Sequence, residues 1–167
     1  TAADINEYSK TILQGCPGVD NLVKVRMANA VAVKEGLKLK KGFSEALSTY
    51  YDAYVRSMKF DDTAVKEIND WCNRQTEGMI PEIIDEIDPT TALIALNSIY
   101  FNGIWKSRFS EKDTKEESFK SIDGTSGKVK MMHAEGSCEH SSNHIWNTVK
   151  LPYGNGSYSM YVLLPHE

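Results

Sequence analysis

The chain has 167 residues, of which 41% are hydrophobic and 25% are charged, and its formal net charge at pH 7 is −4. This composition can build a hydrophobic core and excludes a disordered tail, and the mild acidity argues against a dedicated nucleic-acid-binding domain, which would show a concentrated basic face. No apolar run approaches the roughly 18 residues that a membrane-spanning helix needs, and no signal peptide is visible.

Helices and strands alternate in the first part of the chain. Apolar residues at helical spacing predict a short helix from Ile5 to Leu13. Strict alternation then predicts a strand from Leu22 to Val33, whose second half is covered on both faces because both rows of side chains become apolar. A second helical face predicts a helix from Lys40 to Tyr51, and renewed alternation predicts a strand from Tyr54 to Phe60.

A third helix is predicted after Asp61-Asp62. We expect Thr63 to begin it by accepting a hydrogen bond from a free backbone N–H, and Gly78 to end it. One side of this helix is apolar and should pack against the rest of the fold. Its members are Val65, Ile68, Trp71, Cys72 and Met79.

The run from Thr91 to Phe101 is the most apolar in the chain, and it predicts a strand that is buried on both sides. Asn97 interrupts the run, and an amide buried there must find hydrogen-bond partners or cost roughly 1–3 kcal/mol. It is either a satisfied core asparagine or a polar latch that holds neighbouring strands in one of two arrangements. Trp105, just past the strand, is either a core aromatic or marks the place where a strand enters the sheet.

The second half of the chain is nearly all β. Asp123-Gly124 and Gly154-Asn155-Gly156 are hairpin signals. The charged stretch from Glu111 to Glu117 is interpreted as solvated. The predicted strands are Val129 to His133, Ile145 to Tyr153 and Tyr158 to Leu164. Helices mixed with strands first and strands alone later predict an α+β protein.

Few residues indicate a catalytic or metal-binding site. Three residues are of types that bind zinc, namely Cys138, His140 and His144. They fall in a loop-and-strand region without a CxxC pair, so we interpret them as polar surface residues near a hairpin. An unrelated metal-binding module is kept as a weaker alternative. Cys16, Cys72 and Cys138 are too few for a disulfide scaffold. No nucleophile motif and no P-loop is present, so the sequence predicts neither an enzyme nor a cofactor.

One stretch is distinctive. Asn97, the aromatic pair Tyr100-Phe101, Gly103 and Trp105 resemble a strand signature of the serpin family. Other segments match the family in the same order. They are Asn29-Ala30-Val31, Ile68-Asn69-Asp70-Trp71 with Thr76 to Ile80, Val129 to Met132, Leu151 to Tyr153, and Ser159 to Pro165. The resemblance covers nearly the whole chain and implies a serpin-like fold, with helices packed on a large mixed β-sheet plus further antiparallel sheets.

The resemblance also implies a function. In the family, a protease cleaves an exposed reactive loop, which then inserts as a new strand into the main sheet. By resemblance, Asn97 falls in the shutter of that sheet and Trp105 in its breach, and the two would act as a conformational switch. The helix from Thr63 to Gly78 would gate the sheet. Its signature residues are Ile68, Asn69, Trp71, Thr76 and Gly78.

A complete serpin is more than twice as long as this chain. We therefore expect residues 1–167 to be the central part of a single domain, in which the N-terminal helices, the reactive loop and the residues that pair with Asn97 and Trp105 are absent. The expected partners are a serine protease, bound through the missing loop, and the remaining serpin segments. An extracellular location is favoured by resemblance. The alternative is a segment of a non-inhibitory serpin that acts as a carrier or chaperone.

Overall fold

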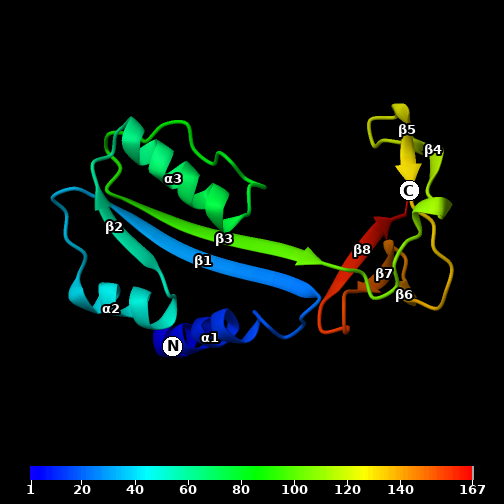
Figure 1. The fold of residues 1–167 in the computed structure, drawn as a ribbon, viewed down its shortest axis with the longest axis horizontal. Helices are drawn as coiled ribbons and strands as arrows, with labels where there is room; N and C mark the ends of the chain where they lie inside the picture. The colour runs from blue at the N-terminus through cyan, green and yellow to red at the C-terminus, as the bar shows by residue number, and fades with distance from the viewer. Residues whose placement is uncertain (167) are drawn as a thin grey trace. The chain divides into compact units, whose positions relative to one another are not determined.

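The computed structural model describes residues 1–166, which divide into two units (Figure 1). One unit consists of Thr1–Val19 and Lys24–Asn102, and the other of Asp20–Val23 and the residues from Gly103 onward. In the described residues, no helix combines the length and the apolar character that crossing a membrane requires.

The first unit contains a three-stranded sheet with the order β2-β1-β3. Its strands are β1 (Val23–Lys34), β2 (Tyr54–Met58) and β3 (Leu93–Gly103). β1 and β2 are parallel, with Ala30 opposite Tyr54. β3 runs antiparallel to β1 (Figure 1), and the Lys34 N–H donates to the Ala92 carbonyl over 3.0 Å. The sheet is therefore mixed, as predicted, and β3 forms one of its edges.

The central strand β1 carries the core of this unit. Residues 30 to 33 are only 3–5% exposed, which confirms that the second half of the strand is covered on both faces. On one face, Ala28 and Ala30 pack against Trp71 and Cys72 of helix α3 (Asp62–Gln75). Because successive side chains of a strand alternate between faces, Asn29 points to the opposite face.

Helices α1 (Ala2–Gly15) and α2 (Lys41–Tyr50) lie on the side of the sheet opposite α3 (Figure 1). The Asn29 amide donates to the Tyr51 carbonyl over 2.8 Å, and the Tyr51 hydroxyl donates to Asn6 Oδ1 over 2.9 Å. These bonds connect α1 and α2 to the face of β1 that α3 does not cover. The two predicted helices are confirmed, with ends within a few residues of those expected.

Helix α3 begins two residues earlier than a cap at Thr63 would place it. The Asp61 carboxylate accepts hydrogen bonds from the backbone N–H groups of Thr63 (3.0 Å) and Ala64 (3.4 Å), so Asp61 is the N-cap. The prediction that Thr63 is the cap is wrong because its backbone N–H is one of the donors that the cap satisfies.

The end of α3 also differs from the prediction that Gly78 stops it. The helix ends at Gln75, and Glu77 follows in the left-handed region with φ 53°. The Gly78 N–H donates to the Asn73 carbonyl over 2.9 Å, which closes a Schellman motif in which Glu77 occupies the position that glycine usually takes. Met79 lies beyond this turn and is 74% exposed, so it is not part of the buried side.

Strand β3 is not buried on both sides in this chain. Leu93, Ile99 and Phe101 are 37%, 63% and 41% exposed. They lie on the same face as Asn97, because they are separated from it by even numbers of residues. The prediction of a doubly buried strand is wrong here because no helix or strand of the described residues covers this face of β3, whereas Leu96 on the other face packs against the α3 core.

The second unit is built from antiparallel strands and the single-turn helix η1 (Glu111–Asp113). β4 (Lys115–Lys120) and β5 (Ser126–Met131) form one hairpin, and a second sheet has the order β6-β7-β8. Its strands are β6 (Glu139–Ser142), β7 (Trp146–Pro152) and β8 (Ser159–Pro165). Both predicted hairpin turns are confirmed, whereas β4 and β6 were not predicted because their side chains are polar and mostly exposed.

Candidate functional site

The predicted gating role concerns the contact between α3 and the sheet. Ile68 and Cys72 are each 2% exposed, and Trp71 packs with Cys72 against Ala30 of β1. Trp71 and Cys72 lie three and four positions after Ile68, so one helical face meets the sheet. The apolar side predicted from the sequence is confirmed except for Met79.

A cavity of about 450 Å³ opens beside this contact. Ile68 and Trp71 of α3, Ala32 of β1 and Met58 of β2 are among the residues that line it. The Arg56 guanidinium and the Glu67 carboxylate, which also line it, form an ion pair of 3.1 Å between β2 and α3. The packing under α3 is therefore incomplete on the side of β2.

Asn69 and Thr76 hold the segment that follows the helix. The Asn69 amide donates to the Ile84 carbonyl over 2.8 Å, and its oxygen accepts from the N–H groups of Ile83 (2.9 Å) and Ile84 (3.2 Å). The buried Thr76 hydroxyl donates to the Cys72 carbonyl over 2.9 Å and accepts from the Ile80 N–H over 3.0 Å. Two of the signature residues thus tie the following segment back to α3.

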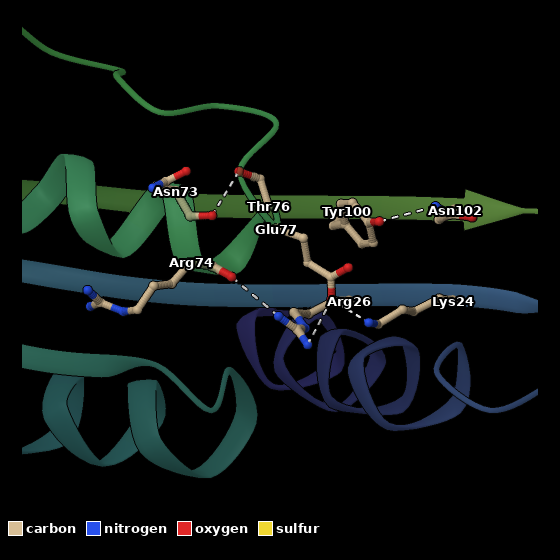
Figure 2. A network of polar contacts seen from close by, with 8 residues as sticks. All are labelled: Lys24, Arg26, Asn73, Arg74, Thr76, Glu77, Tyr100 and Asn102. Carbon is tan, nitrogen blue, oxygen red and sulfur yellow. Dashed lines mark hydrogen bonds and ion pairs between the residues drawn. The ribbon is translucent and has the colours of Figure 1, made fainter.

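A polar network joins the end of α3 to β1 and β3 (Figure 2). The Glu77 carboxylate accepts a short hydrogen bond from the Lys24 ammonium and lies 3.4 Å from the Arg26 guanidinium. Arg26 also donates to the Arg74 carbonyl over 3.3 Å, which satisfies a carbonyl at the helix end. Sequence reasoning assigned Glu77 no role, because Glu77 falls inside the predicted helix, one position before the glycine that was expected to end it.

The surroundings of Glu77 favour its charged form. The pKa of the Glu77 carboxyl is lowered, and the hydrogen bond from Lys24 is the largest cause. Partial burial raises the pKa and opposes this effect. The Tyr100 hydroxyl and the charges of Lys24 and Arg26 lower the pKa further. Tyr100 lies on β3, and its hydroxyl accepts a hydrogen bond of 3.2 Å from the Asn102 amide. The Glu77 carboxylate therefore binds two cations of β1, and the Lys24 ammonium lies 6.0 Å from the centre of the Tyr100 ring on β3.

Asn97 has a partner inside this chain. Its amide donates to Asn29 Oδ1 over 2.9 Å, so a side-chain bond connects β3 to β1. Asn29 in turn donates to the Tyr51 carbonyl. Asn97 thus has one partner within the chain, whereas the partners expected from segments outside it stay a prediction. Asn97 is exposed and not buried, because the face of β3 on which it lies is uncovered in the described residues.

Trp105 also has its partners in the chain. Its ring stacks on Tyr153 with the centroids 4.1 Å apart and the planes 14° from parallel, and Phe109 meets it edge-on at 6.3 Å. Trp105 and Tyr153 also form an isolated antiparallel bridge. β7 returns Tyr153 to the segment that follows β3, so Trp105 has partners within the chain, and those expected from segments outside it stay a prediction. Of the two readings of Trp105, the contacts match a core aromatic of the second unit.

The weak metal-site candidates lie on or near the β6–β7 hairpin. His140 is on β6 opposite Val149, His144 is in the turn that follows, and Cys138 precedes the strand and is exposed. Across residues 1–166, no three or more His, Cys, Asp or Glu side chains come together in a group that could hold a metal ion. The geometry thus gives the metal-binding alternative no site.

Known proteins share this sequence and this fold. The family model described as "Serpin (serine protease inhibitor)" matches residues 1–167. Serpin-Z4 from Hordeum vulgare is 35% identical over 151 residues, which cover 85% of this chain and 38% of that protein. The native state of tengpin, a thermophilic serpin, matches with a TM-score of 0.92 and 27% identity over all of this chain and 43% of that one.

Ovalbumin from the emu, Dromaius novaehollandiae, matches with a TM-score of 0.86 and 28% identity, covering 93% of this chain and 42% of the ovalbumin chain. The chain thus spans less than half the length of these relatives. The order of elements, with α3 packed on a mixed sheet and antiparallel sheets following, is the serpin-like α+β fold. Because the family model matches the chain from its first residue to its last, the chain belongs to the serpin family.

Proposed function

We propose that residues 1–167 are the central part of a single serpin domain that inhibits serine proteases by cleavage of a reactive loop and insertion of that loop into the sheet. The family is described as one of serine protease inhibitors. The protease would bind through a loop that lies elsewhere in the domain, and this segment would supply the sheet that receives the loop.

The position of β3 is the observation that carries this proposal. It is an 11-residue strand at one edge of the sheet, so its outer backbone N–H and C=O groups can pair with an added strand. A strand that pairs there gains a ladder of hydrogen bonds along the whole length of β3. That gain is the free energy which loop insertion needs.

The exposed side chains of β3 support the proposed partnership with the remaining serpin segments. Leu93, Ile99 and Phe101 form an apolar row on the face opposite α3. Apolar rows on a strand are stabilised when another layer covers them. We infer that other segments of the same domain cover this row.

The proposed switch residues fit this mechanism. Asn97 lies on β3, the strand beside which a loop would be added, and bonds that strand to β1 through Asn29. Ile68, Asn69, Trp71, Thr76 and Gly78 belong to the helix and turn that lie on the same sheet. We infer that this helix must yield when a strand is added. Trp105, stacked on Tyr153, would form part of the breach.

The second candidate is a segment of a non-inhibitory serpin that acts as a carrier or chaperone. The structural match to emu ovalbumin is the observation that keeps this candidate. The segment would then have the same fold, and the difference would lie in the reactive loop.

The test uses the full-length protein that contains this segment, incubated with trypsin-like and chymotrypsin-like serine proteases. Inhibition predicts an SDS-stable covalent complex that is absent when the active-site serine of the protease is blocked. Cleavage of the loop without such a complex would contradict the inhibitory function and favour the second candidate. If inhibition is seen, Asn97→Ala should change the rate of insertion or the thermal midpoint, and no change in either would argue against the switch.

A further inference from the structure

We propose that Glu77 is a latch that ties the C-terminal end of α3 to β1, and that opening this latch sets how readily the helix yields to an incoming strand. The second part rests on the proposed function. The latch itself is a property of contacts that the described residues make among themselves.

The backbone at Glu77 is the first observation. With φ 53°, Glu77 occupies the left-handed position of the Schellman motif, where a residue with a Cβ is disfavoured and glycine is preferred. A glycine stands one position later, at Gly78, and does not take this place. An unfavourable backbone conformation persists only when surrounding contacts stabilise it. The Glu77 side chain makes such contacts with Lys24 and Arg26, in addition to the Gly78–Asn73 backbone hydrogen bond.

The charged groups around the carboxylate are the second observation. Lys24 and Arg26 are two residues apart on β1, so both point to the face that α3 covers. Both cations meet the one carboxylate of Glu77, and the Lys24 ammonium also lies 6.0 Å from the centre of the Tyr100 ring. The Glu77 side chain is 33% exposed, so the surrounding groups shield it partly from solvent.

The packing under the helix is the third observation. The face of β1 under α3 carries small side chains in one row, which are Ala28, Ala30 and Ala32. The cavity opens beside this row. Because the side chains are small and a cavity lies beside them, α3 makes fewer dispersion contacts with the sheet than a fully packed helix would. The helix is anchored by Trp71 and Cys72 near its C-terminal end, and Glu77 adds the polar contact immediately beyond them.

The experiment compares three variants of the full-length protein with the wild type. Glu77→Gln keeps the size of the side chain and removes its charge. Glu77→Gly removes every side-chain contact but relieves the backbone. Glu139→Gln is the matched control, because Glu139 also forms an exposed ion pair across two elements, at 3.0 Å from Lys150 between β6 and β7.

Two readouts are measured for each variant. Hydrogen exchange of the amides in residues 70–80 reports the latch without any protease. The rate at which a synthetic peptide with the protein's own reactive-loop sequence inserts into the sheet reports the gating role. We expect Glu77→Gln and Glu77→Gly to speed exchange about two- to fivefold, as loss of an ion pair allows, and to speed peptide insertion by a similar factor, with Glu139→Gln unchanged.

Unchanged hydrogen exchange in Glu77→Gln would overturn the latch. Slower exchange in Glu77→Gly would also overturn it, since glycine would stabilise the helix end if Glu77 did no more than end the helix. Faster exchange with unchanged peptide insertion would overturn the gating role. A wild-type protein that forms no covalent complex with proteases would contradict the proposed function, and the exchange measurement would still decide the latch.

Discussion

At the scale of single residues, Asp20 shows how one buried carboxylate fixes a turn that is far away in the sequence. Asp20 is 2% exposed and accepts hydrogen bonds from the backbone N–H groups of Leu22 (2.9 Å) and Asn155 (2.6 Å). A Cβ atom at Gly154 would lie 2.1 Å from Asp20 Oδ2. The sequence explained the glycines of this turn by hairpin geometry alone, and the structure adds the carboxylate as a second reason.

This close approach predicts that Gly154→Ala lowers the free energy of unfolding by at least about 2 kcal/mol, because the new methyl group must displace a buried, hydrogen-bonded carboxylate. Gly124→Ala is the control. Gly124 also has a positive φ, of 83°, but a Cβ there meets no atom within 4 Å, so only the backbone cost of about 1 kcal/mol is expected. Chemical denaturation of both variants measures the difference, and equal losses would contradict the role of Asp20.

At the scale of elements, periodicity predicted α1, α2, α3, β1 and β2 because each carries apolar residues on one face, and an unbroken apolar run predicted β3. It failed for β4 and β6, whose exposed polar residues carry no pattern and which form because β5 and β7 offer them hydrogen-bond partners. It also misplaced both ends of α3. Two adjacent acidic residues and a threonine are all acceptable caps, so local sequence could not choose among them.

The observed cap of α3 leads to a second prediction. Asp61→Ala should cost about 1 kcal/mol in the free energy of unfolding, because it leaves the N–H groups of Thr63 and Ala64 without their acceptor. Thr63→Ala should change it by less than about 0.5 kcal/mol, since Thr63 participates in this cap through its backbone. Thermal or chemical unfolding distinguishes the two, and a larger loss for Thr63→Ala would restore the cap expected from the sequence.

At the scale of the whole molecule, the bare apolar row of β3 bears on the proposal that this chain is the centre of a larger domain. If other serpin segments cover the row, Ile99→Asp in the full-length protein should destabilise it by about 2 kcal/mol or more, because a charge would be placed in a buried layer. Ile122, at the tip of the β4–β5 hairpin, is fully exposed. Ile122→Asp is the control, and similar small effects of both changes in an unfolding experiment would argue against a covering layer.

The sequence by itself determined that the chain folds as α+β, which residues form the apolar sides of β1 and α3, and, through its ordered motifs, the serpin family. These properties depend on local periodicity and on residue types that a reader can find in the chain. Only the tertiary structure decided that Asn97 meets Asn29, that Trp105 stacks on Tyr153, and that Glu77 contacts β1. Each of these contacts joins residues more than twenty positions apart, so its existence depends on how the strands and helices pack and not on the sequence around either partner.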